Sequence, residues 1–286
     1  MAILLVIPFL AGMCITMFLL AIKRQWKSAL TILLIVVVTN TLSETFPLNF
    51  RYFNKKKSGE ITVLVYNVHG FDEEYCDKQV DIAQTIISES PDVVFLCEFP
   101  LYKSFVLDSI LTKDYEYTQY YQDGTFSVFY SKFKIDSVAH INSLSSKKLC
   151  LPNLVYASVG EDTLALVGCH LSSSNNHIRK GYQNRRYESE SIYETINKES
   201  HPIIVMGDLN DISGSYTIEH IKDAGLKDAW WRGGFGYGAT FHERWIKLRL
   251  DHILYQESKL DLQYVKRIES KLSDHNALVA SLKMQH

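Results

Sequence analysis

The tetrapeptide Gly207-Asp208-Leu209-Asn210 places a carboxylate and an amide directly after the apolar run 203–206. A short run rich in β-branched residues is typical of a strand that is buried on both faces. Side chains that follow such a strand are held by a rigid scaffold, as catalysis requires. Because alternate residues of an extended chain face the same side, Asp208 and Asn210 can address one ligand together.

Further polar side chains stand at the ends of other apolar runs, and Asp251 lies inside one, where an unpaired charge would be costly. Any one of these short motifs could be an ordinary turn or cap. The ordered set indicates a catalytic site more strongly than any single member. In chain order, the polar residues and their apolar runs are Asn67 after 61–66, Glu98 after 92–97, His170 after 164–169, Asp208 and Asn210 after 203–206, Asp251 within 250–255, and Asp274 with His275 before 277–282.

These residues, in this order, resemble the endonuclease/exonuclease/phosphatase superfamily, which includes DNase I-like nucleases, inositol polyphosphate phosphatases and bacterial sphingomyelinases. The resemblance covers about residues 61–286. It implies an α/β fold, namely a four-layer α/β sandwich in which two packed mixed β-sheets are flanked by helices. It also implies a metal-dependent hydrolase that acts on phosphate esters.

The resemblance implies a metal centre built from three residues of this sequence. Glu98 holds the ion, Asn67 lies beside it and helps to bind metal or phosphate, and Asp274 completes the metal environment. A hard divalent cation would neutralise charge on the phosphoryl oxygens. Carboxylate and amide ligands, with few cysteines, favour Mg²⁺, with Mn²⁺ also possible, over zinc.

The resemblance also implies the catalytic roles. Asp208 orients or deprotonates the attacking water, and Asn210 donates a hydrogen bond to a phosphate oxygen. His275 contacts the phosphate and takes part in proton transfer, while Asp251 orients its imidazole, since a carboxylate fixes the tautomer and raises the basicity. His170 contacts the phosphate or the leaving group.

Substrate choice is expected in loops around these residues. The glycine- and aromatic-rich segment 229–242 and the segment 172–182 are the two candidate specificity loops. Arg249 is a weaker phosphate candidate, with a structural ion pair as the alternative. His69 and His252 stay outside the predicted catalytic set; at His252 the resembling family commonly carries an aromatic such as Tyr.

The charge balance argues mildly against a dedicated nucleic-acid-binding surface. Residues 51–286 hold 27 basic and 31 acidic residues, a net charge of −4. Proteins built to bind nucleic acid usually display a strong basic excess. A local basic patch formed by Arg179, Lys180, Arg185 and Arg186 is one interpretation, and solvated charge at a helix start is the other. The five cysteines suggest neither a disulfide framework nor a zinc site, so buried free thiols are expected.

Strand-like runs outnumber clear helical patterns, which is compatible with two packed sheets. Strands are predicted at 61–66, 92–97, 126–130, 154–159, 163–169, 203–206, 251–255 and 277–282, and helices at 77–89, 101–111, 185–198 and 215–223.

The first 48 residues predict a membrane anchor of two transmembrane helices. Residues 2–22 form an uncharged apolar stretch about long enough to cross a bilayer, and residues 29–42 form a second, shorter one. A cleaved signal peptide is the alternative, but the start is not basic and no clear small-residue cleavage site follows. Residues 49–60 are expected to be a basic linker, and 61–286 the catalytic domain.

Basic residues flank the second apolar run on both sides, so the inside rule alone does not orient the anchor. A short cytoplasmic loop between the helices would place the catalytic domain outside the cytoplasm, which is the orientation we expect.

Three functions are compatible with the sequence. The first is a membrane-anchored, Mg²⁺-dependent phosphoesterase acting on a phosphodiester or phosphomonoester. The second is a nuclease acting on DNA or RNA, and the third is a noncatalytic binding domain, which would be expected to have lost some of the residues above. The expected partners are a phosphate-ester substrate (a lipid headgroup, an inositol phosphate or nucleic acid) and the membrane, with no obligate protein partner evident.

Overall fold

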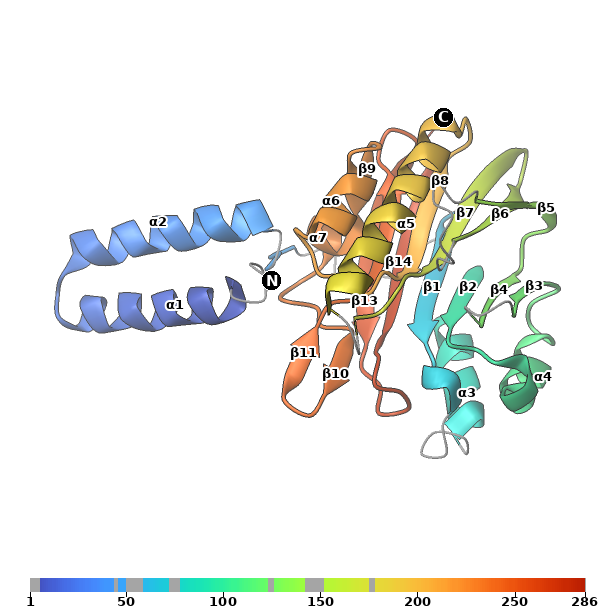
Figure 1. Ribbon diagram of the computed structural model, residues 1–286, viewed down its shortest axis with the longest axis horizontal. Helices are drawn as coiled ribbons and strands as arrows, with labels where there is room; N and C mark the ends of the chain where they lie inside the picture. Colours follow the sequence, from blue (N-terminus) through green and yellow to red (C-terminus); the bar gives the residue numbers. More distant parts are fainter. Residues whose placement is uncertain are drawn as a thin grey trace.

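Two six-stranded β-sheets are packed face to face in the computed structural model, with helices on both outer sides (Figure 1). The structure describes residues 6–43, 46–49, 59–71, 78–122, 126–141, 152–174 and 178–285. Most of the predicted basic linker, together with Cys76 and Cys150, lies outside these residues. The predicted α/β sandwich of two mixed sheets flanked by helices is confirmed.

In the first sheet, β1 and β2 are parallel and the other neighbours are antiparallel. Helices α3 (Gln79–Glu89) and α4 (Phe105–Leu111) pack their apolar side chains on its outer face. The strand order is β13 (Leu260–Ile268), β14 (Ala277–Met284), β1 (Ile61–Asn67), β2 (Val93–Cys97), β4 (Ser127–Ser131) and β3 (Tyr117–Tyr121).

The second sheet repeats this plan, with one parallel pair, β7 and β8, among antiparallel neighbours. Helices α5 (Ile178–Lys198) and α6 (Tyr216–Lys222) cover its outer face. The strand order is β5 (Ile135–His140), β6 (Asn153–Val159), β7 (Asp162–His170), β8 (Ile203–Asp208), β12 (Asp251–Gln256) and β9 (Leu226–Asp228).

Both faces of each central strand are covered, which explains the continuous apolar runs in the sequence. All seven residues of β1 are buried. Val63 and Val65 face the core between the sheets, whereas Leu64 and Tyr66 face α3 and α4. The strands that carry the candidate catalytic residues are thus held on both sides.

Gly207 lets β7 and β8 approach closely just before Asp208. Its φ is 147°, and a Cβ added there would lie 1.8 Å from the carbonyl oxygen of Cys169. A side chain at this position would therefore push apart the parallel pair of strands that ends at the candidate site.

We expect Gly207→Ala to lower the free energy of unfolding by about 4 kcal/mol or more, because clash and backbone strain act together. Chemical denaturation of the full chain measures the change. Gly160→Ala is the matched control: Gly160 also has a positive φ but open space around it, so backbone strain alone should cost about 1 to 2 kcal/mol. Equal losses in the two variants would contradict the close approach.

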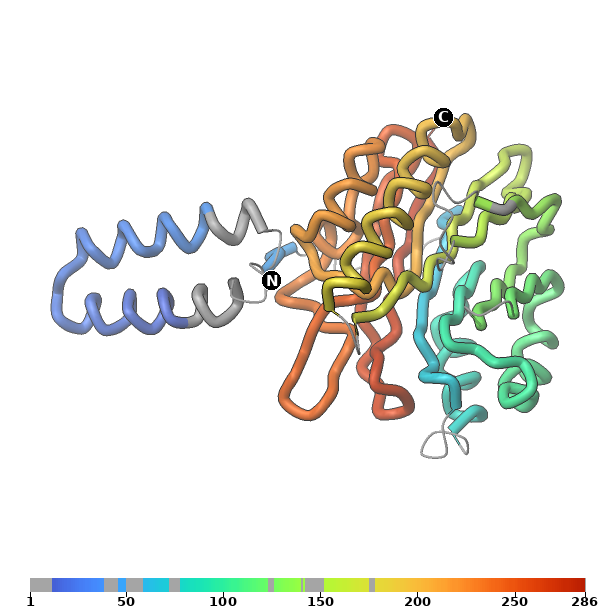
Figure 2. Tube along the Cα trace, viewed as in Figure 1, coloured from blue at the N-terminus to red at the C-terminus, as the bar shows by residue number. Residues whose placement is uncertain are grey.

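The N-terminal segment forms a hairpin of α1 (Val6–Ile22) and α2 (Trp26–Ser43), which stands away from the sandwich (Figures 1 and 2). After the hairpin, the backbone N–H of Asn49 donates to the carbonyl of Gly234 at 3.1 Å, which connects the start of the linker to the catalytic domain. Among the described residues, no helix is long and apolar enough to cross a membrane. The predicted pair of transmembrane helices is therefore not confirmed.

All eight predicted strands and all four predicted helices have counterparts, and the structure adds elements that the sequence patterns did not predict. Helix α5 begins at Ile178, about two turns earlier than the expected start at residue 185. The added elements are β3, β5, β9, β13, the hairpin of β10 (Phe241–Glu243) and β11 (Ile246–Leu248), and the short helix α7 (Ala229–Gly233). Part of the predicted loop 229–242 is thus regular structure.

Candidate active site

The predicted site residues come together because the parallel pairs of both sheets end at one edge of the sandwich. Asn67 is the last residue of β1 and pairs in register with Cys97, the residue before Glu98. In the second sheet His170 is the register partner of Asp208. The carboxyl ends of parallel strands meet at the same edge, and the antiparallel neighbours begin there, so β12 starts with Asp251 and β14 follows directly after the 274–276 segment.

A hydrogen bond from the Asn67 side chain joins the two sheets at this edge. Asn67 Nδ2 donates to Glu98 Oε1 at 2.9 Å and to Asp208 Oδ2 at 3.0 Å. Its Oδ1 accepts the backbone N–H of His69 at 3.0 Å. Asn67 thus positions two carboxylates, while its own oxygen is engaged by the backbone; its predicted role as a metal ligand stays a prediction.

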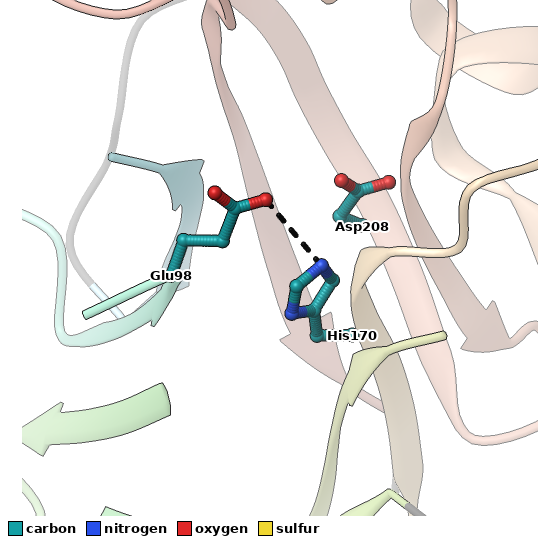
Figure 3. Close-up of side chains that lie close together, drawn as sticks. All are labelled: Glu98, His170 and Asp208. Atoms are coloured by element: carbon teal, nitrogen blue, oxygen red, sulfur yellow. Dashed lines mark ion pairs between the residues drawn. The ribbon is translucent and has the colours of Figure 1, made fainter. Parts of the chain in front are cut away.

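Glu98, His170 and Asp208 converge on one point (Figure 3). One potential ligand atom from each side chain lies within 4.8 Å of the others, and His170 Nε2 is 3.6 Å from Glu98 Oε1. Asp208 is buried, whereas Glu98 and His170 are partly exposed. A ligand can therefore reach the cluster from solvent on the side of Glu98 and His170.

The donor chemistry of this cluster suits a divalent cation. Two carboxylates and an imidazole converge, and Asp251 brings a third carboxylate to the other side of Asp208. Such a concentration of negative charge at a partly buried edge is stabilised by a cation, and hard cations prefer oxygen ligands. Glu98 and Asp208 are the carboxylates that could hold it, and the identity of the metal remains a prediction.

Asp208 is held in one orientation at 2% exposure. Its Oδ1 accepts the backbone N–H of Asn210 at 2.9 Å, and Oδ2 accepts from Asn67. Burial and the neighbouring charge of Asp251 raise the pKa of the Asp208 carboxyl above its usual range. A carboxylate with a raised pKa is a better proton acceptor near neutral pH, which fits the predicted role in activating water.

His275 and Asp251 form a buried pair. Asp251 Oδ2 lies 2.7 Å from His275 Nδ1, so Nε2 is turned toward Asp208 Oδ2, 3.8 Å away. Burial opposes charging of the imidazole, but Asp251, Asp208 and Asp274 outweigh it and raise the pKa of His275 to about 10. At neutral pH His275 is therefore an imidazolium, with a cationic N–H at the candidate site.

This pKa predicts how the stability of the metal-free protein depends on pH. A folded-state pKa of about 10, above the ordinary 6.5, stabilises the fold fully below pH 6.5 and loses that contribution as the pH rises toward 10. We expect the unfolding free energy of the full chain to fall by several kcal/mol across this window. His275→Gln lacks the titrating group, so the stability difference between wild type and variant should shrink over the same window; a difference independent of pH would contradict the assignment.

Asp274 lies at the same edge but is engaged by another histidine. Its Oδ2 is 3.0 Å from His69 Nδ1, and its backbone carbonyl accepts the N–H of His242 at 2.8 Å. His69 was left outside the predicted set and is here the direct partner of a predicted metal ligand. The role of Asp274 at the metal stays a prediction.

Asn210 and the loop after His170 are bonded to each other. Asn210 Nδ2 donates to the carbonyl of Leu171 at 2.9 Å, which leaves its second N–H for a ligand. Asn210 has a φ of 50°, a left-handed conformation that only local support maintains in a non-glycine residue.

Of the four cations in the predicted basic patch, Arg179, Lys180 and Arg186 are exposed, whereas Arg185 is buried. Arg185 is 6% exposed, and it donates to Asp211 Oδ2 at 3.2 Å and to the carbonyl of Ser172 at 2.7 Å. The guanidinium of Arg186 lies over the ring of Tyr216. Arg185 is therefore a structural residue that holds Asp211 and the loop at Ser172 in place.

Thr240 and Phe241 support the site and were not singled out from the sequence. Thr240 Oγ1 accepts the backbone N–H groups of Leu250 and Asp251, each at 3.0 Å. The Phe241 ring lies edge-on against the His275 ring, with centroids 5.1 Å apart. Both belong to the segment 229–242, whose aromatic content was a signal, but no local pattern identifies their partners.

Comparison with known proteins gives a family match over most of the chain. Residues 64–275 match the model of the Endonuclease/Exonuclease/phosphatase family. Among curated proteins, none matches the sequence.

Solved structures share the fold at low sequence identity. D. rerio TDP2 complexed with single strand DNA product aligns with a TM-score of 0.65 at 18% identity, covering 79% of this chain and 100% of that chain. The human Nocturnin catalytic domain with bound sulfate anion gives 0.63 at 16%, covering 79% and 95%. An endonuclease/exonuclease/phosphatase from Bacteroides vulgatus gives 0.65 at 17%, covering 79% and 99%.

Proposed function

We propose that this chain, which belongs to the Endonuclease/Exonuclease/phosphatase family, hydrolyses phosphate-ester bonds of nucleic acid by attack of water. The chain is a metal-dependent phosphoesterase. The observation that carries the proposal is the convergence of Glu98, His170 and Asp208 within 4.8 Å, beside the paired Asp251 and His275. These groups supply three functions. Their negative charge can hold a cation, one carboxylate can accept a proton, and the imidazolium is a cationic hydrogen-bond donor.

The proposed reaction breaks one P–O bond and forms another. The carboxylate of Asp208 takes a proton from a water molecule as its oxygen bonds to phosphorus, and the ester oxygen departs on the opposite side. The hydrogen bond from Asn210 N–H to Asp208 Oδ1 orients the carboxylate for this transfer. A positioned general base of this kind contributes about 10² to 10⁴ in rate.

Charge on the phosphoryl oxygens is met by hydrogen-bond donors of the chain. The imidazolium of His275 is held by Asp251 at 2.7 Å and presents Nε2–H to the site. The second N–H of Asn210 Nδ2 is the other donor. We propose that His170 contacts the leaving oxygen, which takes up a proton from solvent on release, while Asp208 returns its proton to solvent. Fixed donors aimed at developing charge lower the barrier because they need no reorganisation.

We propose Mg²⁺, with Mn²⁺ as a substitute, held by Glu98 with Asp208, Asn67 and Asp274 around it. The ion would neutralise phosphoryl charge and help to stabilise the leaving oxygen. The carboxylate-rich donor set supports this assignment.

The likeness in fold to D. rerio TDP2, whose structure was solved with single strand DNA product, favours nucleic acid over lipid or inositol phosphates as the substrate class. The exposed Arg179 and Lys180 at the start of α5 follow the His170 loop and could meet a phosphate backbone. The overall net charge of −2 predicts modest affinity rather than tight non-specific binding.

The substrate class is tested by turnover of the purified full chain with Mg²⁺ on single- and double-stranded DNA, RNA, sphingomyelin vesicles and inositol phosphates. We expect cleavage of nucleic acid. Selective release of a lipid headgroup or of phosphate from inositol phosphates would replace nucleic acid as the substrate while leaving the phosphoesterase assignment intact.

We further propose that the α1 and α2 hairpin associates with a lipid bilayer and that the catalytic domain is extracytoplasmic. The hairpin exposes large apolar side chains, among them Ile15 at 62%, Phe18 at 65% and Leu34 at 64%. Exposed apolar area of this kind is typical of an interaction surface. Alkaline extraction of membranes should retain wild type and release a Leu34→Asp variant; recovery of wild type in the wash would refute the association.

A further inference from the structure

Asn210, like Glu98, has a left-handed backbone conformation. Asparagine adopts a φ near 50° more readily than other side-chain-bearing residues, and contacts around it select this conformation. Its own bonds run to Asp208 Oδ1 and to the Leu171 carbonyl. Contacts of the following residues, 211–213, also determine where the Asn210 side chain lies.

His252 fixes this segment from the side of β12. Its Nε2 lies 3.0 Å from the backbone carbonyl of Asp211. A carbonyl oxygen only accepts, so Nε2 carries the hydrogen and donates it. The side chain of Asp211 is held from the opposite side, where its Oδ2 accepts from Arg185 Nε at 3.2 Å and from Thr217 Oγ1 at 2.8 Å.

Arg249 and Asp228 form a buried ion pair that contacts the Nδ1 side of the His252 ring. Arg249 Nη1 donates to Asp228 Oδ2 at 2.8 Å, and His252 Nδ1 lies 3.0 Å from the same nitrogen. Arg249 Nη2 also donates to Ser213 Oγ. His252, Asp228 and Arg249 are 0%, 1% and 2% exposed. None of the three belongs to the cluster in which Glu98, His170 and Asp208 converge, yet two of them bond directly to the segment after Asn210.

The electrostatics of the trio favour a single arrangement. Burial raises the pKa of Asp228, but the Arg249 guanidinium and His252 outweigh it and lower that pKa well below its usual range. Asp228 Oδ1 is also fixed, since it accepts the backbone N–H of Trp230 at 2.8 Å at the start of α7. With both oxygens of Asp228 engaged, the imidazole plane of His252 has little freedom.

We propose that His252 is a positioning residue of this enzyme, which, braced by Arg249 and Asp228, donates Nε2–H to the Asp211 carbonyl and thereby holds Asn210 against the phosphate. The inference rests on the proposed function for its catalytic consequence, whereas the structural support of the loop does not depend on turnover. His252 acts through Asn210, not on the substrate itself.

The structural part is tested by amide hydrogen exchange of the full chain, followed by mass spectrometry. His252→Phe keeps a buried ring but removes both nitrogens. We expect peptides that cover residues 209–214 to exchange about tenfold faster, while peptides of β2 are unchanged. Ser213→Ala, which removes only one contact of Arg249, should show the same effect more weakly, and unchanged protection of the segment in both variants would overturn the proposal whether or not the enzyme turns over any substrate.

The catalytic part is tested with bis(4-nitrophenyl) phosphate and Mg²⁺ as the probe. We expect His252→Phe to lower kcat about 10- to 100-fold with KM and the Mg²⁺ dependence changed less than about twofold. His252→Gln keeps an N–H donor near the same place and should restore most of the rate. His220→Phe is the matched control, because His220 contacts Glu190 at 2.9 Å between α5 and α6, away from the site, and should leave kcat unchanged.

A double-mutant cycle decides whether His252 acts through Asn210. In an Asn210→Ala background the loss caused by His252→Phe should shrink to less than about twofold, because the positioned group is already gone. The same loss in both backgrounds would show that His252 acts elsewhere, and equal kcat for the Phe and Gln variants would show that the donated hydrogen is irrelevant. Either result overturns the proposal.

Discussion

Asp208→Asn should lower kcat on the preferred phosphate ester by about 10³-fold or more while leaving the fold intact. The amide has the size of the carboxylate and can keep a contact with Asn210 N–H, now 2.9 Å from Oδ1. It cannot accept a proton from water, so the general-base contribution is lost. The substitution also removes negative charge beside Glu98, which weakens the hold on a cation. Steady-state kinetics at saturating substrate and saturating divalent ion separate the two effects, because only the loss of the base persists when the ion site is full.

Asp223→Asn is the matched control for this prediction. Asp223 is an exposed carboxylate at the C-terminal end of α6. The same chemical change there should leave kcat within about twofold of wild type. A kcat for Asp208→Asn within tenfold of wild type would contradict the assignment of Asp208 as the group that activates water.

Glu98→Gln should raise the concentration of divalent ion needed for half-maximal activity by about 100-fold or more. Loss of a residue that merely orients a metal ligand already costs about 10- to 100-fold in metal affinity, and Glu98 Oε1 lies 3.6 Å from His170 Nε2 and 2.9 Å from Asn67 Nδ2. The amide also removes a charge from a cluster whose other carboxylates repel one another. Titration of Mg²⁺ against turnover measures the shift directly.

Glu161→Gln provides the comparison for that titration. Glu161 is exposed in the turn between β6 and β7, at the opposite end of the strand that delivers His170. Its removal changes the net charge of the protein equally but not the local field at the site. An equal Mg²⁺ requirement for Glu98→Gln and wild type would contradict Glu98 as the metal-binding carboxylate.

The sequence predicted the site better than the periphery because the site lies at the ends of the most apolar strands. Asn67, Glu98, His170 and Asp208 follow strands buried on both faces, and a continuous apolar run needs no partner to be recognised. Their proximity follows from the parallel pairs ending at one edge, which the resemblance to a known family implied. The contacts of Asn67 across the two sheets could not be predicted from spacing.

Strand β13 shows why other elements were missed. Leu260 and Leu262 are buried with a polar residue between them, but a register irregularity follows at Leu262/Tyr264, so the alternation is interrupted. The strand is also less apolar than its neighbours because it lies at an edge of the sheet. The β10 and β11 hairpin was missed for the related reason that each strand is only three residues long.

The interpretations of Arg185 and His252 show the limit of reasoning from residue type. Arg185 belongs to a group of cations that the sequence predicts to be a patch or solvated charge, yet its side chain is buried and donates to the carbonyl of Ser172 in the loop after His170. His252 was noted in the sequence and left outside the catalytic set, but its partners could not be predicted, because Asp228 and Asp211 lie 24 and 41 positions away. Burial and pairing at such separations are properties of the fold.

The most direct test of the account is turnover of a single-stranded oligonucleotide by the full chain after exhaustive chelation, before and after Mg²⁺ or Mn²⁺ is restored, with Asp208→Asn in parallel. We expect cleavage to disappear on chelation, to return with the ion, and to be absent from the variant under both conditions. Cleavage that persists without a divalent ion, or that Asp208→Asn retains, would contradict a metal-dependent attack of water at this site.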